Sequence, residues 1–334
     1  MKFLLKVVGY FLASLVALVL CAWLFIELTW KKTYAKLQLP EIHASSDPGV
    51  IAQGDYLVHA VSHCSICHEP AEQFKALQPG STDPGGADLI GGHEWQAGPF
   101  GTFHAANITP DSETGIGGLS DGELARVIRQ GVRKDGSQAV FMSFVVGPMA
   151  DEDLTAIISY LRTLPPMKHD NPKDELGLAG KLVMKLFEPR SDPAPQWAPP
   201  GGISIERGRY LANGPAWCVG CHTAADPFKG MKFTGAPLSG NPEAEPDPTD
   251  PDFEFVEPNL TPDPETGHIT QWTEDAFVAR FKVGAVFKGT KMPWPNFAHM
   301  TEDDVRSIFR YLRSLPPTKN YIGPTRRPKG GKAQ

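Results

Sequence analysis

An internal repeat is the feature that most constrains the fold of this 334-residue chain. Three short blocks of sequence occur twice, in the same order in both halves of the chain. Such self-similarity predicts a duplicated structural unit, because both copies carry the same local folding signals. The paired blocks are Gly54–Leu57 with Gly208–Leu211, Asn107–Gly115 with Asn259–Gly267, and Asp153–Pro166 with Asp304–Pro317.

A cysteine-containing pentapeptide follows the first block of each copy at the same distance. The two pentapeptides, CSICH and CVGCH, hold four of the five cysteines of the chain. The C-x-x-C-H pattern is typical of covalent attachment of a c-type haem. Two thiols on one turn can form thioethers to one porphyrin, and the next histidine can then reach the iron. We therefore predict two haem c groups, bound through Cys64, Cys67, Cys218 and Cys221, with His68 and His222 on the irons.

A zinc site and a redox-active dithiol are the alternatives for these cysteines. Ribbon-type zinc sites usually bring two cysteine pairs within about 15–20 residues of each other, whereas these pairs lie in different halves of the chain. A redox-active dithiol is expected beside a βαβ pattern, which neither pentapeptide shows. Both alternatives are therefore weaker than haem attachment.

A methionine ahead of the last helix of each copy is the predicted sixth ligand of each iron. A lone methionine is more often a gap-filler in a core, but the soft sulfur suits haem iron and both copies carry one in the same region. We predict Met142 and Met292 as these ligands. Met149 is the alternative to Met142, which lacks the proline that follows Met292, and Met300 is predicted to be a core residue.

Other histidines are the remaining candidates for the sixth position. None of them recurs at a matched position in the two copies, so we expect them to have surface or hydrogen-bonding roles. They are His59, His63, His93, His104, His268 and His299.

Both copies carry the signals of short helices. Helical stretches are predicted before the pentapeptides, over Val50–Ser62 and Ile205–Gly214. Ser120 and Glu123 form a capping-box pattern ahead of one helix, and Thr273 begins its counterpart. The last helix of each copy has apolar residues at helical spacing and ends at a pair of prolines.

The N-terminal segment is apolar from Val7 to Leu28, with no charge before Glu27. Because about 20 apolar residues span a bilayer, residues 1–32 are predicted to be an uncleaved transmembrane anchor. A cleaved signal peptide is the alternative, although its apolar core is usually shorter. Leu20 disfavours a lipoprotein modification at Cys21, since a small residue is expected immediately before the modified cysteine.

The orientation of the anchor follows from the haem sites, since lysines flank both of its ends and the positive-inside rule does not decide. Haem c is attached outside the cytoplasm in bacteria. We therefore predict a single-pass protein of the bacterial inner membrane with its haem domains on the periplasmic side. Trp23 and Trp30 are expected at the outer membrane interface.

The rest of the chain divides around the repeat. We predict one domain over 48–166 and a second over 203–318, joined by a proline-rich linker at 167–202. Within the linker, Leu178–Phe187 is either an amphipathic helix lying across both domains or a packed turn of an ordinary linker. Residues 319–334 form a basic tail without apolar periodicity and are predicted to be disordered.

The charge distribution adds two expectations. The net charge of −6 argues against a nucleic-acid partner. The acidic segment Glu243–Glu257 is predicted to be a solvated loop, with the steering of a basic redox partner as the alternative.

These motifs together resemble the class I cytochrome c family, present twice. The segments Asn107–Gly115, with Ile116 and Gly117, and Asn259–Gly267 are similar to those of membrane-associated cytochrome c subunits of periplasmic alcohol and gluconate dehydrogenases. The resemblance runs from about Pro48 to Pro317. It implies a mostly α fold, with an N-terminal transmembrane helix followed by two class I cytochrome c domains.

The same resemblance implies roles for individual residues. It implies His68 and His222 as proximal ligands, Met142 and Met292 as distal ligands, and Asn107 and Asn259 as supports of the loop beside each haem.

The expected function is transfer of single electrons by two haems, with a periplasmic dehydrogenase or a membrane respiratory complex as redox partner. In this interpretation the chain is not an enzyme by itself, because the redox chemistry belongs to the haem and the protein supplies ligation and docking. The alternatives are a catalytic dihaem enzyme with one open haem, peroxidase-like or oxidising sulfur compounds, and an integral subunit of a larger respiratory complex.

Overall fold

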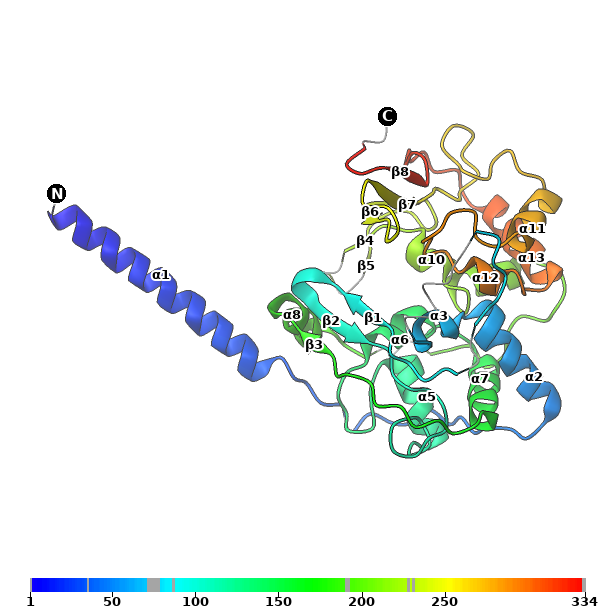
Figure 1. The fold of residues 1–334 in the computed structure, drawn as a ribbon, viewed down its shortest axis with the longest axis horizontal. Helices are drawn as coiled ribbons and strands as arrows, with labels where there is room; N and C mark the ends of the chain where they lie inside the picture. Colours follow the sequence, from blue (N-terminus) through cyan, green and yellow to red (C-terminus); the bar gives the residue numbers. More distant parts are fainter. Residues whose placement is uncertain are drawn as a thin grey trace.

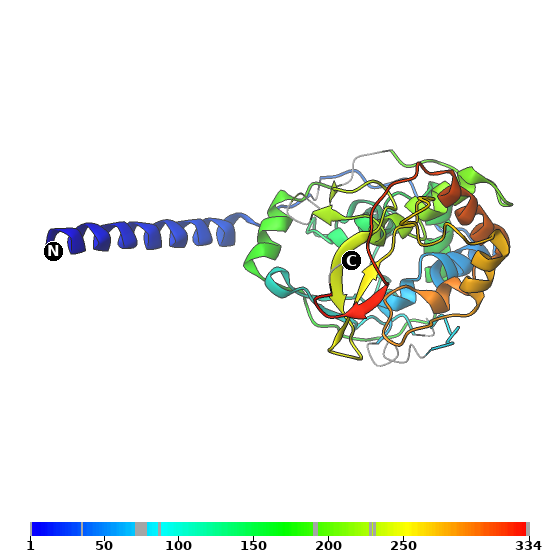
Figure 2. The ribbon, with the colours of Figure 1, turned by 90° about the horizontal axis from the view of Figure 1, so that it is seen from above.

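A long N-terminal helix projects from a globular body in the computed structural model, which describes residues 2–34, 36–70, 79–85, 88–189, 193–226, 229 and 232–331 (Figures 1 and 2). This helix, α1 (Lys2–Thr29), has no buried residue and contains a window of mean hydropathy 2.4. It is long and apolar enough to cross a membrane, and a signal sequence would have the same properties.

Among the described residues, the repeat predicted from the sequence appears as two series of helices that follow the same order. The first series is α2 (Pro48–Tyr56), α3 (Cys64–His68), α5 (Asp121–Gln130), α6 (Val140–Val145) and α7 (Asp151–Thr163). The second series is α9 (Ile205–Asn213), α10 (Cys218–Cys221), α11 (Glu274–Lys282), α12 (Trp294–Phe297) and α13 (Glu302–Ser314). Figure 1 shows the first series in the lower part of the body and the second series above it.

The predicted helix signals are confirmed. Ser120 and Glu123 make both hydrogen bonds of a capping box at the start of α5. Thr273 accepts a hydrogen bond from the backbone of Ala276 at the start of α11. The last helices, α7 and α13, end at Thr163 and Ser314, just ahead of the double prolines.

A glycine allows the first and last helices of each copy to cross closely. A Cβ atom on Gly54 in α2 would lie 2.0 Å from the backbone oxygen of Ala156 in α7. A Cβ atom on Gly208 in α9 would lie 1.9 Å from the backbone oxygen of Ser307 in α13. Both glycines belong to the first repeated block, so the repeat preserves this close packing of backbones.

Substitution of Gly208 by alanine is expected to lower the free energy of unfolding by about 1–3 kcal/mol, because the added methyl group forces α9 away from α13. Gly201→Ala is the matched control, since nothing lies within 4 Å of the added Cβ atom there. Urea unfolding followed by far-ultraviolet circular dichroism measures both variants. Equal stability of the two variants would contradict the close crossing.

The two copies pack against each other through reciprocal contacts. The Tyr56 hydroxyl of α2 donates to the Asp304 carboxylate of α13 at 2.7 Å, and the Tyr210 hydroxyl of α9 donates to the Asp153 carboxylate of α7 at 2.5 Å. Each tyrosine and each aspartate belongs to a repeated block. Buried side chains of both copies form one continuous core, so the copies form a single body.

Short strands, which the sequence analysis did not predict, complete the body. Within the part of the chain that the structure describes, they form three small antiparallel sheets. The first contains β1 (Glu94–Gln96), β2 (Gly101–His104) and β3 (Glu175–Leu176); the second contains β4 (Ala225–Asp226) and β5 (Lys232–Phe233); the third contains β6 (Asn241–Pro246), β7 (Phe253–Glu257) and β8 (Arg326–Pro328). A single-turn 3-10 helix, η2 (Gly98–Phe100), connects β1 to β2.

The third sheet corrects the prediction of a disordered basic tail. Strand β8 lies within that tail and pairs with β7, and Arg326 and Arg327 pair with acidic residues of the segment Glu243–Glu257. The acidic segment is therefore not a plain solvated loop. Its Asp247 carboxylate is buried and lies 2.8 Å from Arg326, so the chain's own tail is the partner of Asp247, Asp250 and Glu254, whereas Glu245 pairs with Lys291. The described part of the tail ends at residue 331.

The predicted helix within the linker is confirmed as α8 (Leu178–Leu186), but its position across both domains is wrong. Gly180 packs against the backbone of Phe100 in η2, and Met184 joins a small cluster with Phe103 and Phe187. Trp30, predicted at the membrane interface, packs partly buried against the same cluster. The helix α8 thus lies against the first copy and the end of α1.

Candidate haem sites

Each pentapeptide begins immediately after a residue in the left-handed conformation. In the first copy the π-helical turn η1 (Leu57–Val61) continues α2, and His63 (φ 40°) then turns the chain into α3. Trp217 (φ 50°) occupies the same position before α10. Such backbone angles are uncommon for residues other than glycine. The shared strained turn places both cysteine pairs in the same way relative to the preceding helix.

The environment of the cysteines does not favour a zinc site. Among the described residues no three His, Cys, Asp or Glu side chains gather as a metal site. The two pairs therefore stay separate, each with its own histidine.

The two predicted proximal histidines have the same second contact. Nδ1 of His68 lies 2.7 Å from the backbone oxygen of Ala106, and Nδ1 of His222 lies 3.0 Å from the backbone oxygen of Pro258. A carbonyl only accepts, so Nδ1 carries the proton and Nε2 presents its lone pair to a metal. Burial also lowers the pKa of His68 and lowers that of His222 to about 4, which keeps both rings neutral. In both histidines Nε2 is thus the nitrogen that is available to bind a metal.

The repeated asparagines hold the loops that orient these histidines. The Asn107 side chain donates to Met167 at 2.7 Å and accepts from the backbone and hydroxyl of Thr109 at 2.9 and 2.8 Å. Asn259 makes the same contacts with Thr318 and Thr261, at 2.8, 2.9 and 2.8 Å. Each asparagine directly follows the residue whose carbonyl accepts from the histidine.

A fourth matched element was missed in the sequence analysis. Leu89 and Leu238 are both fully buried and both have left-handed backbone angles, with φ values of 45° and 61°. Two residues later, the backbone N–H groups of Gly91 and Gly240 donate to the carbonyls of His68 and His222, each at 2.8 Å. The shared Leu-x-Gly pattern was the available signal, but its distance from the histidine differs between the copies.

The methionines fall into two matched pairs. Met142 in α6 and Met292 just before α12 are half-buried and pack at the edge of the core. Met149 and Met300 are completely buried, just before α7 and α13 respectively. Met149 therefore occupies in the first copy the position that Met300 occupies in the second, and Met300 is a core residue as predicted. Met142 and Met292 remain partly accessible to solvent.

The remaining candidate histidines contact protein groups. His59 lies 2.8 Å from the Tyr160 hydroxyl, His63 lies 3.1 Å from the Val61 carbonyl, and His299 lies 2.6 Å from the Thr82 carbonyl. His104 lies 3.4 Å from the Glu94 carboxylate, and the rings of His93 and His268 contact tryptophans. The polar contacts of His59, His63, His104 and His299 agree with the hydrogen-bonding roles expected for them, whereas the ring contacts of His93 and His268 were not predicted.

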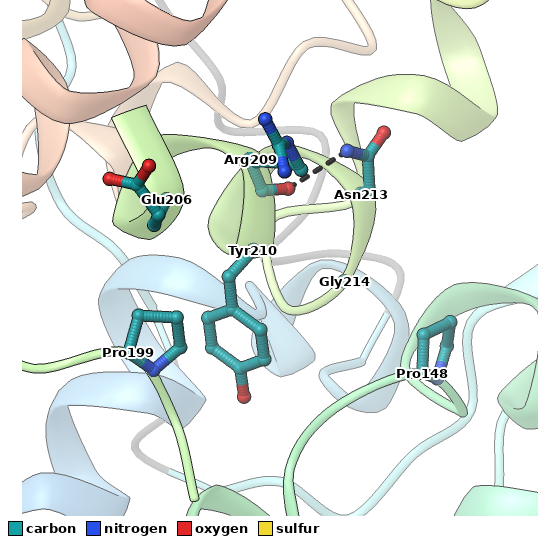
Figure 3. Close-up of a pocket in the computed structure, with 7 residues that line it drawn as sticks. All are labelled: Pro148, Pro199, Glu206, Arg209, Tyr210, Asn213 and Gly214. Atoms are coloured by element: carbon teal, nitrogen blue, oxygen red, sulfur yellow. Dashed lines mark hydrogen bonds between the residues drawn. The ribbon is translucent and has the colours of Figure 1, made fainter. Parts of the chain in front are cut away.

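A shallow pocket lies between the two copies (Figure 3). It is formed by Pro148 of the first copy and by residues along α9 of the second, including Arg209 and Tyr210. None of its lining residues is a cysteine, histidine or methionine. Tyr210 there serves the contact between the copies, so we assign this pocket no part in haem binding.

Comparison with known proteins identifies relatives along most of the chain, although no family model matches it. The chain is 30% identical over 294 residues to the cytochrome c subunit of the quinone alcohol dehydrogenase of Gluconacetobacter polyoxogenes, covering 81% of this chain and 57% of that protein. It is 28% identical to the gluconate 2-dehydrogenase cytochrome c subunit of Pantoea cypripedii, covering 81% of the chain and 60% of the relative. The chain thus spans little more than half the length of these relatives.

A shorter relative matches almost from end to end. The dihaem c-type cytochrome of Cereibacter sphaeroides is 27% identical over 287 residues, which cover 83% of this chain and 89% of that protein. The family resemblance stated from the motifs is therefore confirmed by relatives of both kinds.

Proposed function

We propose that this chain, a dihaem c-type cytochrome homologous to the cytochrome c subunits of quinone alcohol and gluconate dehydrogenases, passes single electrons through two class I cytochrome c domains from a dehydrogenase to a respiratory acceptor. In this proposal the domains correspond to residues 48–166 and 203–318. The haems supply the redox chemistry, and the chain supplies attachment, axial ligands and a buried setting.

The observation that carries this proposal is the matched pair of histidines. In both copies a C-x-x-C-H histidine donates from Nδ1 to the carbonyl just before a repeated asparagine. This arrangement leaves Nε2 of His68 and of His222 free for iron, while Cys64, Cys67, Cys218 and Cys221 would form the thioethers. A half-buried methionine in each copy supports Met142 and Met292 as sixth ligands. Two irons with both axial positions filled suit electron transfer rather than substrate binding.

The partner and the location belong to the same proposal. The names of the relatives support a dehydrogenase as electron donor, and its periplasmic location is inferred from the attachment of haem c outside the cytoplasm. The apolar helix α1 supports anchoring in the bacterial inner membrane, with the haem copies on the periplasmic side, where haem c is attached.

The proposal is tested with the full-length holoprotein purified from a bacterium that assembles cytochromes c. Intact mass is expected to show two haems, and optical spectra are expected to show low-spin iron with the weak long-wavelength band of methionine ligation in the oxidised state. Rapid mixing with a purified quinone-dependent dehydrogenase and its alcohol is expected to reduce both haems.

One result would count against the carrier function and another against the proposed donor. A high-spin signal in the resting protein would favour the catalytic alternative with one open haem. If the protein contains two low-spin haems but purified quinone-dependent dehydrogenases with their substrates do not reduce it, this class of donor would be excluded.

A further inference from the structure

The helix α8 exposes a row of leucines beside the end of α1. Leu178 and Leu186 are 46% and 56% exposed, and the helical period places both on one face together with Leu182. The opposite face carries Gly180 and Met184, which pack into the first copy. In both views α8 lies on the side of the body from which α1 projects (Figures 1 and 2).

Two lysines attach α8 to the last turns of α1. Nζ of Lys181 lies 2.6 and 2.7 Å from the two carboxylate oxygens of Glu27. Nζ of Lys185 donates to the Thr29 hydroxyl at 2.5 Å and lies 4.6 Å from the centre of the Phe25 ring. These lysines lie next to the leucine row on the helix surface, so the exposed leucines face outward close to α1.

The level of this contact along α1 follows from the charges of that helix. The uncharged stretch from Val7 to Ile26 contains about 20 residues, which at about 1.5 Å per residue match the roughly 30 Å hydrocarbon core of a bilayer. Glu27 is therefore the first charged group beyond that core. A helix bonded to Glu27 and Thr29 lies at the depth of the lipid headgroups.

We propose that α8 is a second membrane contact of this protein, an interfacial helix whose leucine row inserts into the headgroup region of the bilayer that α1 spans. The inference rests on the proposed role of α1 as an anchor. Its occupant is lipid, because the exposed row adjoins α1 at the depth where a bilayer surface lies. An interfacial helix attached to the base of the anchor would fix the orientation of both haem copies relative to the membrane plane.

Photocrosslinking of the full-length holoprotein in phosphatidylethanolamine–phosphatidylglycerol nanodiscs tests this inference. The photoreactive residue p-benzoylphenylalanine replaces one residue at a time, at Leu186 and at Leu178. The same replacement at Leu15, within α1, tests whether the anchor contacts lipid. The same replacement at Trp197, which is 66% exposed, tests whether the remaining surface contacts lipid. Mass spectrometry of the irradiated protein detects lipid adducts, and the optical spectrum verifies that each variant folds with both haems.

Lipid adducts are expected at Leu186, Leu178 and Leu15, and no lipid adduct is expected at Trp197. Adducts at Leu15 without any at Leu186 and Leu178 would overturn the interfacial helix and leave the anchor in place. Absence of adducts at all positions, Leu15 included, would overturn the anchor and the interfacial helix together. Protein dimers in place of lipid adducts at Leu186 would assign the leucine row to a second copy of the chain.

Discussion

Replacement of Met292 by alanine is expected to abolish the methionine–iron band of one haem and to lower the reduction potential of that haem. Methionine favours the ferrous state, so its loss stabilises the ferric form. The decrease is expected to be on the order of 100 mV or more, since axial ligands set haem potentials over a range of about 0.8 V. Optical redox titration of the holoprotein measures both effects. Met142→Ala is expected to do the same to the other haem, and the double variant is expected to lose the band completely.

The completely buried methionines provide matched controls for this experiment. Met149→Ala and Met300→Ala are expected to retain the full band but to lower the free energy of unfolding by about 2–5 kcal/mol, since each leaves a cavity in the core. An unchanged band in Met142→Ala together with a reduced band in Met149→Ala would transfer the sixth ligand of the first haem to Met149. An unchanged band in Met292→Ala would contradict the two-methionine arrangement.

The substitutions Asp304→Asn and Asp153→Asn are expected to differ in their effect on stability, although the repeat relates the two positions: only Asp304→Asn is expected to destabilise the protein. The Asp304 carboxylate holds the buried Arg207 guanidinium in a two-pronged ion pair, at 2.7 and 3.1 Å. Asp304→Asn removes the hydrogen-bonded counter-charge of that buried cation, leaves it only the longer-range attraction of the Asp153 carboxylate, and is expected to cost about 3–5 kcal/mol of unfolding free energy. In the first copy Gln53 takes the place of Arg207. The Gln53 amide nitrogen makes only a long hydrogen bond, of 3.5 Å, to the Asp153 carboxylate.

Burial therefore raises the pKa of Asp153 above its ordinary value. A raised pKa in the folded state means that folding favours the protonated carboxyl, and this stabilisation is lost as the pH rises through the folded-state pKa. Asp153→Asn mimics the protonated form and still accepts a hydrogen bond from Tyr210. The variant is therefore expected to be as stable as the parent protein or more stable at pH 7.

Urea unfolding at several pH values measures this difference. The advantage of Asp153→Asn is expected to disappear as the pH falls toward about 3.9, the ordinary aspartate pKa. A large loss of stability in Asp153→Asn at pH 7 would show that its carboxylate is as strongly compensated as that of Asp304. In that case the asymmetry between the two contacts would not exist.

The elements that the sequence predicted correctly depend on short-range signals. A cap such as Ser120 with Glu123 bonds within one helical turn, and a proline pair ends a helix at its own position. Each C-x-x-C-H pentapeptide contains two cysteines and a histidine within five residues, so its predicted haem attachment is also a short-range signal. For the same reason the order of the helices in both copies could be predicted from the repeat.

The second contact of each histidine could not be predicted from the pentapeptides. Ala106 and Pro258 lie 38 and 36 residues beyond His68 and His222, and only the folded loops bring their carbonyls within hydrogen-bond distance. Leu89 and Leu238 were missed because the chain between them and the histidine differs in length, which obscures the match in the sequence.

By itself, the sequence determined that two equivalent haem-binding units follow one apolar segment, since covalent attachment motifs, caps and helix-ending prolines act over a few residues. Only the tertiary structure decided which distant charges meet. The basic tail pairs with β7 as β8, where Arg326 and Arg327 meet Asp247 and Glu254, and α8 lies beside the end of α1, where Lys181 meets Glu27. The energy of an ion pair depends on the distance between its groups, and the fold of the whole chain determines that distance.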